Sequence, residues 1–333
     1  MVVRKIVAVF VCFALWCSIP VQCRAERLLG FLDASSALEP VNVGKVAPRF
    51  CHSVGIRKFV NSFTSYQFVN PFPPFQDPLS RLEFPIDQWF WGLTGKYEAR
   101  AWSISAQGWA NVNRESVAKM QDSDWDDDAN PSQKTIFSES ECRLNKGLIF
   151  DTYIGVTIPW QRFNSVKPLL GYRYQYFSFT THDGVQFDLG GSPIDLPGDG
   201  IDFRQIFNHL YFGGVFSRSF NLGTLFGNAQ MLDFECQIDY ALVSARNEDL
   251  HLLRKGDRMT AETTLGHCWH LLVSMEFFRR GTLSARIEAD FKRLLTDGDH
   301  QLRNTLFNLN FSFDGSRVWS DQASISALGQ IVF

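Results

Sequence analysis

Residues 231–243 read MLDFECQIDYALV and change between apolar and polar at nearly every step. One set of alternate positions is apolar throughout and consists of Leu232, Phe234, Cys236, Ile238, Tyr240 and Leu242. The intervening positions hold Asp233, Glu235, Gln237 and Asp239. Because successive side chains of a β-strand point to opposite faces, this segment predicts a strand with one apolar and one charged face.

The same alternation recurs over residues 283–292 and 307–313. These segments are longer than the roughly 5–6 residues usual for strands of a soluble sandwich. Apolar side chains on the outside and polar ones on the inside are typical of a barrel in a bacterial outer membrane. Such a sheet must close, because an open edge in lipid would leave backbone groups unpaired. We therefore predict an all-β fold, an antiparallel transmembrane β-barrel, with a secreted β-sandwich as the alternative.

The pattern predicts ten strands, with twelve as the alternative. They are placed near residues 57–69, 82–98, 100–112, 142–160, 168–181, 203–220, 230–245, 258–278, 282–295 and 321–333. Residues 303–313 are assigned to the upper part of the last hairpin. Long connections at 113–140, 182–202 and 246–257 are expected at the extracellular rim.

Aromatic residues near strand ends are expected to form girdles at the membrane surfaces. The candidates are Trp89, Trp91, Trp102, Trp109, Tyr172, Tyr174, Tyr176 and Tyr211. The chain also ends in an alternating strand that closes with Phe333, which is typical of barrels assembled into a bacterial outer membrane.

The N-terminus predicts an export signal over residues 1–25. Arg4 and Lys5 precede an apolar core, and Cys23-Arg24-Ala25 offers small residues at the positions read by a signal peptidase. Residues 26–333 are then expected to form one barrel domain. The 32 basic residues are matched by 35 acidic ones and form no cluster, so nucleic-acid binding is not expected. No Cys-x-x-Cys pair indicates zinc, and no cofactor is predicted.

Two of the predicted rim loops carry the candidate catalytic residues. Residues 121–128, QDSDWDDD, hold five carboxylates, and residues 246–251, RNEDLH, hold Asp249 and His251. The first loop does not match the calcium-binding loop of an EF-hand. Asp127 stands where that pattern requires Gly, and Gln133 stands where it requires the final Glu. In an extended chain Asp249 and His251 project to the same side, where a carboxylate can orient an imidazole that accepts a proton.

Together the two loops resemble those of the omptins, outer-membrane endopeptidases built as ten-stranded barrels with the active site at the outer rim. Asp122, Asp124 and Trp125 match the family's Asp-x-Asp before Trp, and Asp249 and His251 match its later Asp-x-His. Matching segments between and after them are Leu144-Asn145, Phe150-Asp151, Gly171-Tyr172, Phe177-Ser178-Phe179-Thr180, Phe203-Arg204-Gln205, Tyr211 with Gly213, and Phe333. The resemblance spans residues 67–333.

The resemblance implies an endopeptidase of aspartyl type that needs no metal and acts on polypeptides outside the cell. His251, oriented by Asp249, would deprotonate a water held between the two pairs. Asp122 and Asp124 are close like charges, so one proton is expected to be shared between them and one pKa to be raised. The alternative is an inactive barrel of this kind that serves as an adhesin or a porin.

The departures from the family concern the substrate and the lipid. Omptins typically cut between basic residues, and Gln67 and Asn247 fall where two acids that hold the first basic side chain are expected. A further acid expected near Thr135 or Ile136 is also missing. Possible substitutes are Glu248, Asp126, Asp127 and Asp128. These differences argue against a dibasic preference.

The family's lipopolysaccharide-binding Arg positions fall on Tyr176 and Ile206. This argues against dependence on lipopolysaccharide, with Arg204 and Arg218 left as candidates for a variant site.

Overall fold

The computed structural model describes residues 49–99, 101–160, 163–225 and 228–333. Strands and turns make up this part of the chain. The strands are β1 (Arg49–Phe59), β2 (Phe63–Phe68), β3 (Ser80–Pro85), β4 (Trp89–Glu98), β5 (Trp102–Asn111), β6 (Met120–Asp124), β7 (Ile136–Val156), β8 (Ile158–Trp160), β9 (Phe163–Asp188), β10 (Ile194–Leu225), β11 (Asn228–His251), β12 (Arg258–Arg280), β13 (Leu283–Asn304) and β14 (Leu309–Val332).

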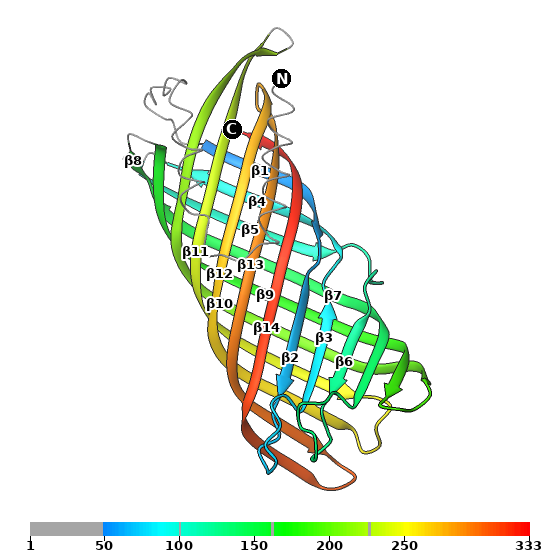
Figure 1. Cartoon of the computed structure of the whole chain (residues 1–333). Coiled ribbons are helices and arrows are strands. Elements are labelled where there is room, and N and C mark those ends of the chain that lie inside the picture. Colours follow the sequence, from blue (N-terminus) through cyan, green and yellow to red (C-terminus); the bar gives the residue numbers. More distant parts are fainter. Residues whose placement is uncertain (1–48, 100, 161–162, 226–227) are drawn as a thin grey trace. The chain divides into compact units, whose positions relative to one another are not determined.

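The described strands close into an antiparallel barrel of ten (Figure 1). Strands β7 and β9 to β14 pair in sequence order along most of its length. At one end β1, β4 and β5 complete the ring, and at the other end β2, β3 and β6 do so. Each of these short strands is therefore half of a longer barrel strand that is interrupted on the way, and the predicted number of ten is confirmed.

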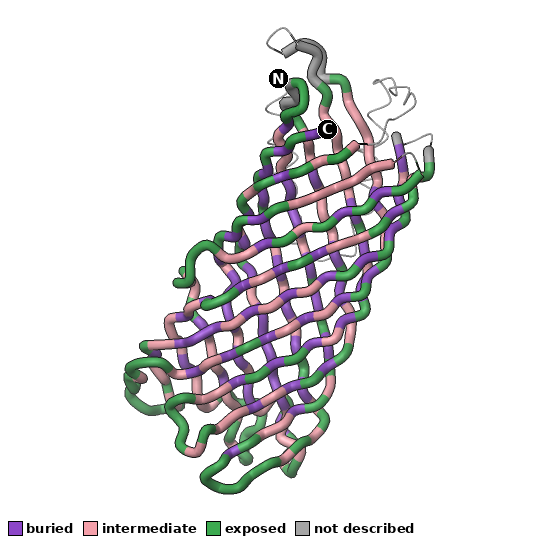
Figure 2. The backbone as a smooth tube through the Cα atoms, turned by 180° about the vertical axis from the view of Figure 1, so that it is seen from behind, coloured by how far each residue is buried: buried purple, intermediate pink, exposed green. Residues whose placement is uncertain are grey.

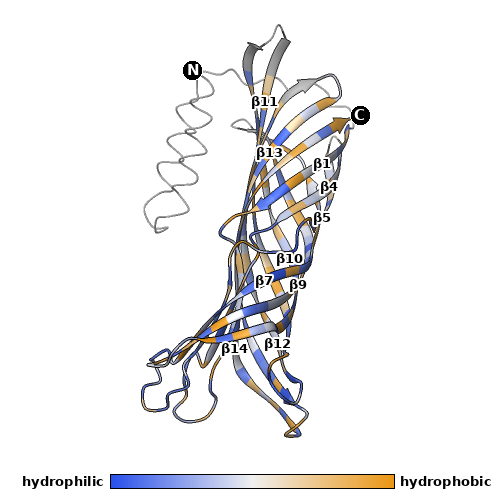
Figure 3. Ribbon diagram, turned by 90° about the vertical axis from the view of Figure 1, so that its right-hand side faces the viewer, coloured by the Kyte–Doolittle hydropathy of each residue, from blue (hydrophilic) through white to orange (hydrophobic). Residues whose placement is uncertain are grey.

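Burial alternates along the strands, as Figure 2 shows. In β11, Gln237 and Asp239 are buried in the barrel, whereas Ile238 and Leu242 are exposed on its outer surface. Hydropathy alternates along the same strands in Figure 3. Polar residues inside and apolar residues outside are what a barrel in lipid requires, because its outer face contacts hydrocarbon.

Charged side chains inside the barrel pair with one another, as the alternation predicts. The guanidinium of Arg173 lies 2.6 Å from Asp151 and 3.7 Å from Asp239, and His270 lies 2.5 Å from the same Asp239 carboxylate. Each of these groups is buried. Buried charges are tolerated only when they are paired and hydrogen-bonded, so this network fills the lumen at a much lower cost than isolated charges would.

Two of the residues predicted for the aromatic girdles, Trp109 and Tyr211, are instead buried inside the barrel. The Tyr211 hydroxyl donates a 2.5 Å hydrogen bond to Asp151. Its ring passes over Gly171, where an added Cβ would lie 2.3 Å from the Tyr211 ring. Trp89, Trp91, Trp102 and Tyr172 are exposed, in keeping with the girdle prediction.

The expected rim loops are largely strands. β6 forms within 113–140, β9 and β10 extend through 182–202 and leave only 189–193 as their turn, and β11 continues to His251. The prediction missed these extensions because strands above the membrane need no apolar face, so only backbone hydrogen bonds define them. The assignment of 303–313 to the last hairpin is confirmed, since its turn is 305–308.

The predicted export signal, residues 1–25, lies outside the described residues. No helix among the described residues is long and apolar enough to cross a membrane.

Candidate active site

Asp122 and Asp124 lie on β6, at the end of the barrel that β2, β3 and β6 complete. Two residues apart on a strand, they face the same way. Asp122 pairs in the ladder with Leu82 of β3, and Leu82 pairs with Tyr66 of β2. Since directly paired residues share a face of the sheet, Tyr66, Leu82 and Asp122 form one row on the inner wall.

Asp249 and His251 lie at the end of β11, beside β10 and β12. Asp249 is completely buried, whereas 17% of the His251 side chain is exposed at the mouth of the barrel. His251 Nε2 lies 3.5 Å from Asp249 Oδ1, an electrostatic contact that is not a hydrogen bond in this structure. The shared face predicted for the Asp-x-His pair is confirmed.

Tyr66 orients the Asp249 carboxylate from across the barrel, a contact that the sequence analysis missed. Its hydroxyl donates a short hydrogen bond to Asp249 Oδ2, and its ring stacks on Phe203 with centroids 5.5 Å apart. One oxygen of Asp249 thus faces Tyr66 while the other faces His251. The sequence carries no signal for this contact, because polar-inside alternation would place Gln67 and not Tyr66 on the inner face, and only barrel closure shows which residue Tyr66 meets.

The two pairs belong to one electrostatic cluster. The negative charge of Asp249 contributes to raising the pKa of Asp122, and that of Asp124 acts to raise the pKa of His251. β6 and β11 are not neighbours in the sheet, so this coupling acts across the mouth of the barrel. The arrangement brings all four sequence-predicted acid and base side chains together.

Burial dominates the protonation of these groups. It raises the pKa of Asp122 well above its usual range, and the neighbouring charges of Asp124 and Asp249 add to the effect. Burial also raises the pKa of Asp124, against a hydrogen bond from Ser80. The pKa of His251 is lowered by burial, with Asp249 acting in the opposite direction. The site therefore favours a proton on the Asp122–Asp124 pair and a neutral imidazole.

Of the three predicted substrate contacts, the structure directs only Asn247 into the barrel. Asn247 is fully buried on the same face of β11 as Asp249, and the next residue, Glu248, is exposed on the outer face. Gln67 lies on the face of β2 opposite to Tyr66, where its Oε1 accepts hydrogen bonds of 3.1 and 2.9 Å from Arg81. Gln67 and Asn247 are therefore not brought together.

A second carboxyl–imidazole pair lies one rung below Asp249. Glu262 of β12 is the ladder partner of both Asn247 and His300, and His300 Nδ1 lies 2.9 Å from Glu262 Oε1. The His300 ring stacks on Phe68 at 4.1 Å. Burial raises the pKa of Glu262 well above its usual range and lowers the pKa of His300 to about 4, so it disfavours the charged form of both groups.

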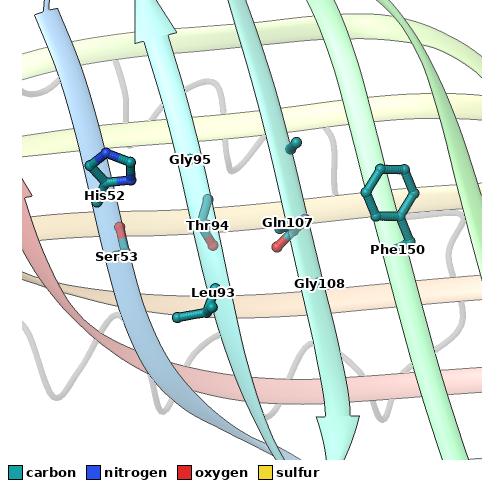
Figure 4. Close-up of a pocket in the computed structure, with 9 residues that line it drawn as sticks. His52, Ser53, Leu93, Thr94, Gly95, Gln107, Gly108 and Phe150 are labelled. Atoms are coloured by element: carbon teal, nitrogen blue, oxygen red, sulfur yellow. The ribbon is translucent and has the colours of Figure 1, made fainter.

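A shallow groove of about 310 Å³ lies elsewhere, on the wall formed by β1, β4, β5 and β7 (Figure 4). Leu93 and Phe150, two of its lining residues, are exposed on the apolar outer surface, and Gly95 and Gly108 leave open space beside them. None of the carboxylates at the barrel mouth lines it. Within the described chain, no group of three or more His, Cys, Asp or Glu side chains is arranged to hold a metal ion.

Comparison with known proteins identifies the family. The family model described as the omptin family matches residues 84–327. No curated protein matches the chain. Among solved structures, the outer membrane protease OmpT of Escherichia coli aligns with a TM-score of 0.73 at 17% sequence identity, covering 89% of this chain and 99% of that one.

A second solved structure, the translocator domain of the autotransporter NalP of Neisseria meningitidis, reaches a TM-score of only 0.31 at 10% identity, covering 91% of this chain and 95% of that one. That likeness is too low to bear on the fold. Because the family model covers more than half of the sequence, and the barrel has the fold of OmpT, the chain belongs to the omptin family of outer-membrane proteases.

Proposed function

We propose that this outer-membrane protease is an endopeptidase that hydrolyses peptide bonds with a water activated between Asp249–His251 and Asp122–Asp124. The observation that carries the proposal is the orientation of Asp249. Tyr66 holds one of its oxygens, and the other lies 3.5 Å from His251 Nε2. A carboxylate fixed in this way keeps the imidazole in the orientation and tautomer needed of a general base.

The reaction would begin with proton transfer from water to His251. With Nε2 turned toward Asp249, Nδ1 is left to accept this proton while the water oxygen attacks the peptide carbonyl carbon. The same proton would then pass to the leaving amine as the C–N bond breaks. The proton on the Asp122–Asp124 pair would donate a hydrogen bond to the oxyanion, where a donor is most effective because water is excluded.

The position of the site supports substrates outside the cell. Leu242 and Leu265 are exposed on the apolar outer surface, whereas Arg246 and Glu248, nearer the end of β11, present charge there. The site at His251 therefore lies beyond the apolar belt, on the side away from the strand β1 and the C-terminal end of β14. In this proposal the chain is exported by its residues 1–25, both chain ends are periplasmic, and the site faces outward.

Replacement of the proposed base provides the test. His251→Ala should lower kcat for peptide cleavage by about 10²–10⁴-fold, the usual contribution of a general base, with little change in KM. The assay uses the purified, refolded protein, with and without lipopolysaccharide, and we expect activity in both. His267→Ala is the matched control, since this imidazole stacks on Tyr240 at 5.9 Å on the outer face of the barrel.

Cleavage at the parent rate by folded His251→Ala and Asp122→Ala variants would show that the mechanism is wrong. A rim that binds polypeptides without cutting them would then be the better description of this protein.

A further inference from the structure

Exposed aromatic side chains gather on two neighbouring loops at the same end of the barrel as the candidate active site. Phe72 and Phe75 of the β2–β3 loop are 57% and 64% exposed, and Phe307 of the β13–β14 turn is 72% exposed. Phe311 stacks on Phe72 with centroids 5.5 Å apart, which joins the two loops. We call Phe72, Phe75, Phe307 and Phe311 the aromatic wall. Exposed apolar side chains that gather in this way often mark a binding surface.

The β2–β3 loop holds its aromatic side chains in a defined conformation. It contains Pro71, Pro73, Pro74 and Pro78. The Asn70 amide donates a 2.5 Å hydrogen bond to Gln76 Oε1, and Gln76 Nε2 donates a 3.1 Å bond to Asp128 Oδ1. Phe75 has a φ of +60°, which a bulky residue adopts only when its surroundings enforce it. A surface ordered in advance loses little entropy when it binds a partner.

The aromatic wall is continuous with the rings beside the candidate active site. From Phe311 the rings continue to Phe313 at 5.4 Å and to His300 at 5.0 Å, beneath Asp249. The loop that follows His251 also packs on the β13–β14 turn. Thr305 N donates a 2.8 Å hydrogen bond to Gly256 O, and a Cβ at Gly256 would lie 2.5 Å from Leu306 Cβ. A chain bound between the two catalytic pairs would therefore meet the aromatic wall on one side.

The opposite side of the barrel mouth carries charged side chains on its outer face. There β7, β9 and β10 connect the two catalytic pairs around the ring. Arg143 of β7 lies 3.2 Å from Glu115 and 3.6 Å from Asp199, and His182 lies 3.0 Å from Asp183. Arg143 alternates along β7 with Cys142 and Leu144, which are buried inside the barrel, so Arg143 and its carboxylate partners lie on the outer face of this wall.

We propose that the aromatic wall is an exosite that binds apolar side chains on one flank of the scissile bond of a polypeptide substrate. This inference rests on the proposed function and adds a direction to its specificity, with apolar residues preferred on one flank only. A lipid surface is the less suitable occupant. The exposed Arg317–Asp297 pair, 2.9 Å apart, lies on β13 and β14 between the aromatic wall and the apolar belt.

The test compares peptides that share one cleavage site and carry a single Phe or Ser at successive flanking positions. For the wild-type protein, Phe should lower KM relative to Ser at positions on one flank. Phe72→Ser and Phe307→Ser should each raise KM for the best Phe peptide by about 10-fold, as expected when much of a buried Phe contact is lost. They should leave kcat, and the KM of the all-Ser peptide, unchanged.

Leu189→Ser is the matched control, because Leu189 is an equally exposed apolar residue in the β9–β10 turn. Fluorescence anisotropy of the same labelled peptides measures their binding without cleavage, so the exosite is tested even if catalysis is absent. The proposal would be overturned by equal KM values for Phe and Ser peptides on both flanks, or by a control variant that changes KM as much as the wall variants do. Loss of vesicle binding with unchanged peptide binding would overturn it in favour of a lipid surface.

Discussion

Burial determines the charge that each side chain of the candidate site carries. Because its pKa is lowered, the His251 imidazole stays neutral at pH values below 6.5, the ordinary pKa of histidine. Because its pKa is raised, the Asp122 carboxyl keeps its proton at pH values above those at which carboxyls usually ionise. An imidazole that accepts a proton and a carboxyl that donates a hydrogen bond can therefore coexist over a common range of pH. The ordinary pKa values of isolated Asp and His would not allow this.

The pH dependence of kcat should reflect both groups. Activity should persist below pH 6.5 and fall only as His251 becomes protonated, because imidazolium cannot accept the proton of water. It should fall again at higher pH as Asp122 loses its proton. Asp122→Asn carries a permanent N–H donor, so the alkaline fall should disappear while the acid fall remains. A kcat–pH profile of both proteins provides the measurement, and an unchanged alkaline limb in Asp122→Asn would contradict the assignment.

Tyr66 is a positioning residue, because it acts on the reaction through Asp249. Tyr66→Phe should lower kcat by about 10- to 100-fold, the effect of losing one hydrogen bond to a charged group. The acid limb of the pH profile should also move to higher pH, since a carboxylate with one fewer donor stabilises imidazolium more strongly.

Tyr172→Phe controls for the loss of a hydroxyl, since this Tyr donates to Asn208 on the outer face. A lower rate with no movement of the acid limb would indicate that Tyr66 contributes only to packing.

At the scale of the strand, register decides which residues reach the cleft. In β2 the inward side chain is Tyr66 and not Gln67, and in β11 it is Asn247 and not Glu248. A shift of one residue exchanges the two faces of a strand, so neighbours in sequence have unrelated environments. Glu262 does face inward beside Asn247, but burial raises its pKa and so disfavours its charged form.

This register predicts a weak preference for basic residues before the cleaved bond. With Asn247 neutral and the charged form of Glu262 disfavoured by burial, Lys or Arg should improve kcat/KM over Ser by about 10-fold or less, which corresponds to about 1.4 kcal/mol. Asn247→Asp should increase the ratio. A peptide library cleaved by both proteins measures it, and a strict dibasic preference of the wild type would refute the prediction.

At the scale of the whole molecule, closure of the ladder joins the first and last strands. β1 and β2 both pair with β14, so every barrel strand has two neighbours. Inside, Arg173, Asp151, Asp239 and His270 form a buried ionic network that links β7, β9, β11 and β12. No single strand can leave without breaking backbone bonds on both sides and exposing these charges to lipid.

We expect this closure to be visible in gel electrophoresis. The protein from outer-membrane fractions should migrate differently in detergent before and after heating, because the closed barrel stays folded until it is heated. His251→Ala should show the same shift, since this side chain makes no bond within the ladder. A single mobility that does not change on heating would contradict a closed barrel.

The sequence by itself determined the barrel and the shared face of Asp249 and His251. Alternation in segments such as 231–243 requires one face in lipid and the other in a polar lumen, and the spacing of Asp249 and His251 places both on one face of a strand. These features depend on neighbours along the chain, which a sequence displays directly.

Only the tertiary structure decided what lies across the barrel from each residue. Tyr66 contacts Asp249 although the two residues are 183 positions apart in the sequence, and Glu262 contacts His300 through the pairing of β12 with β13. The strand character of 182–202 also depends on pairing above the membrane, where no apolar face is needed. Strand register and closure of the ring set such contacts. A shift of one residue in the register would replace every partner.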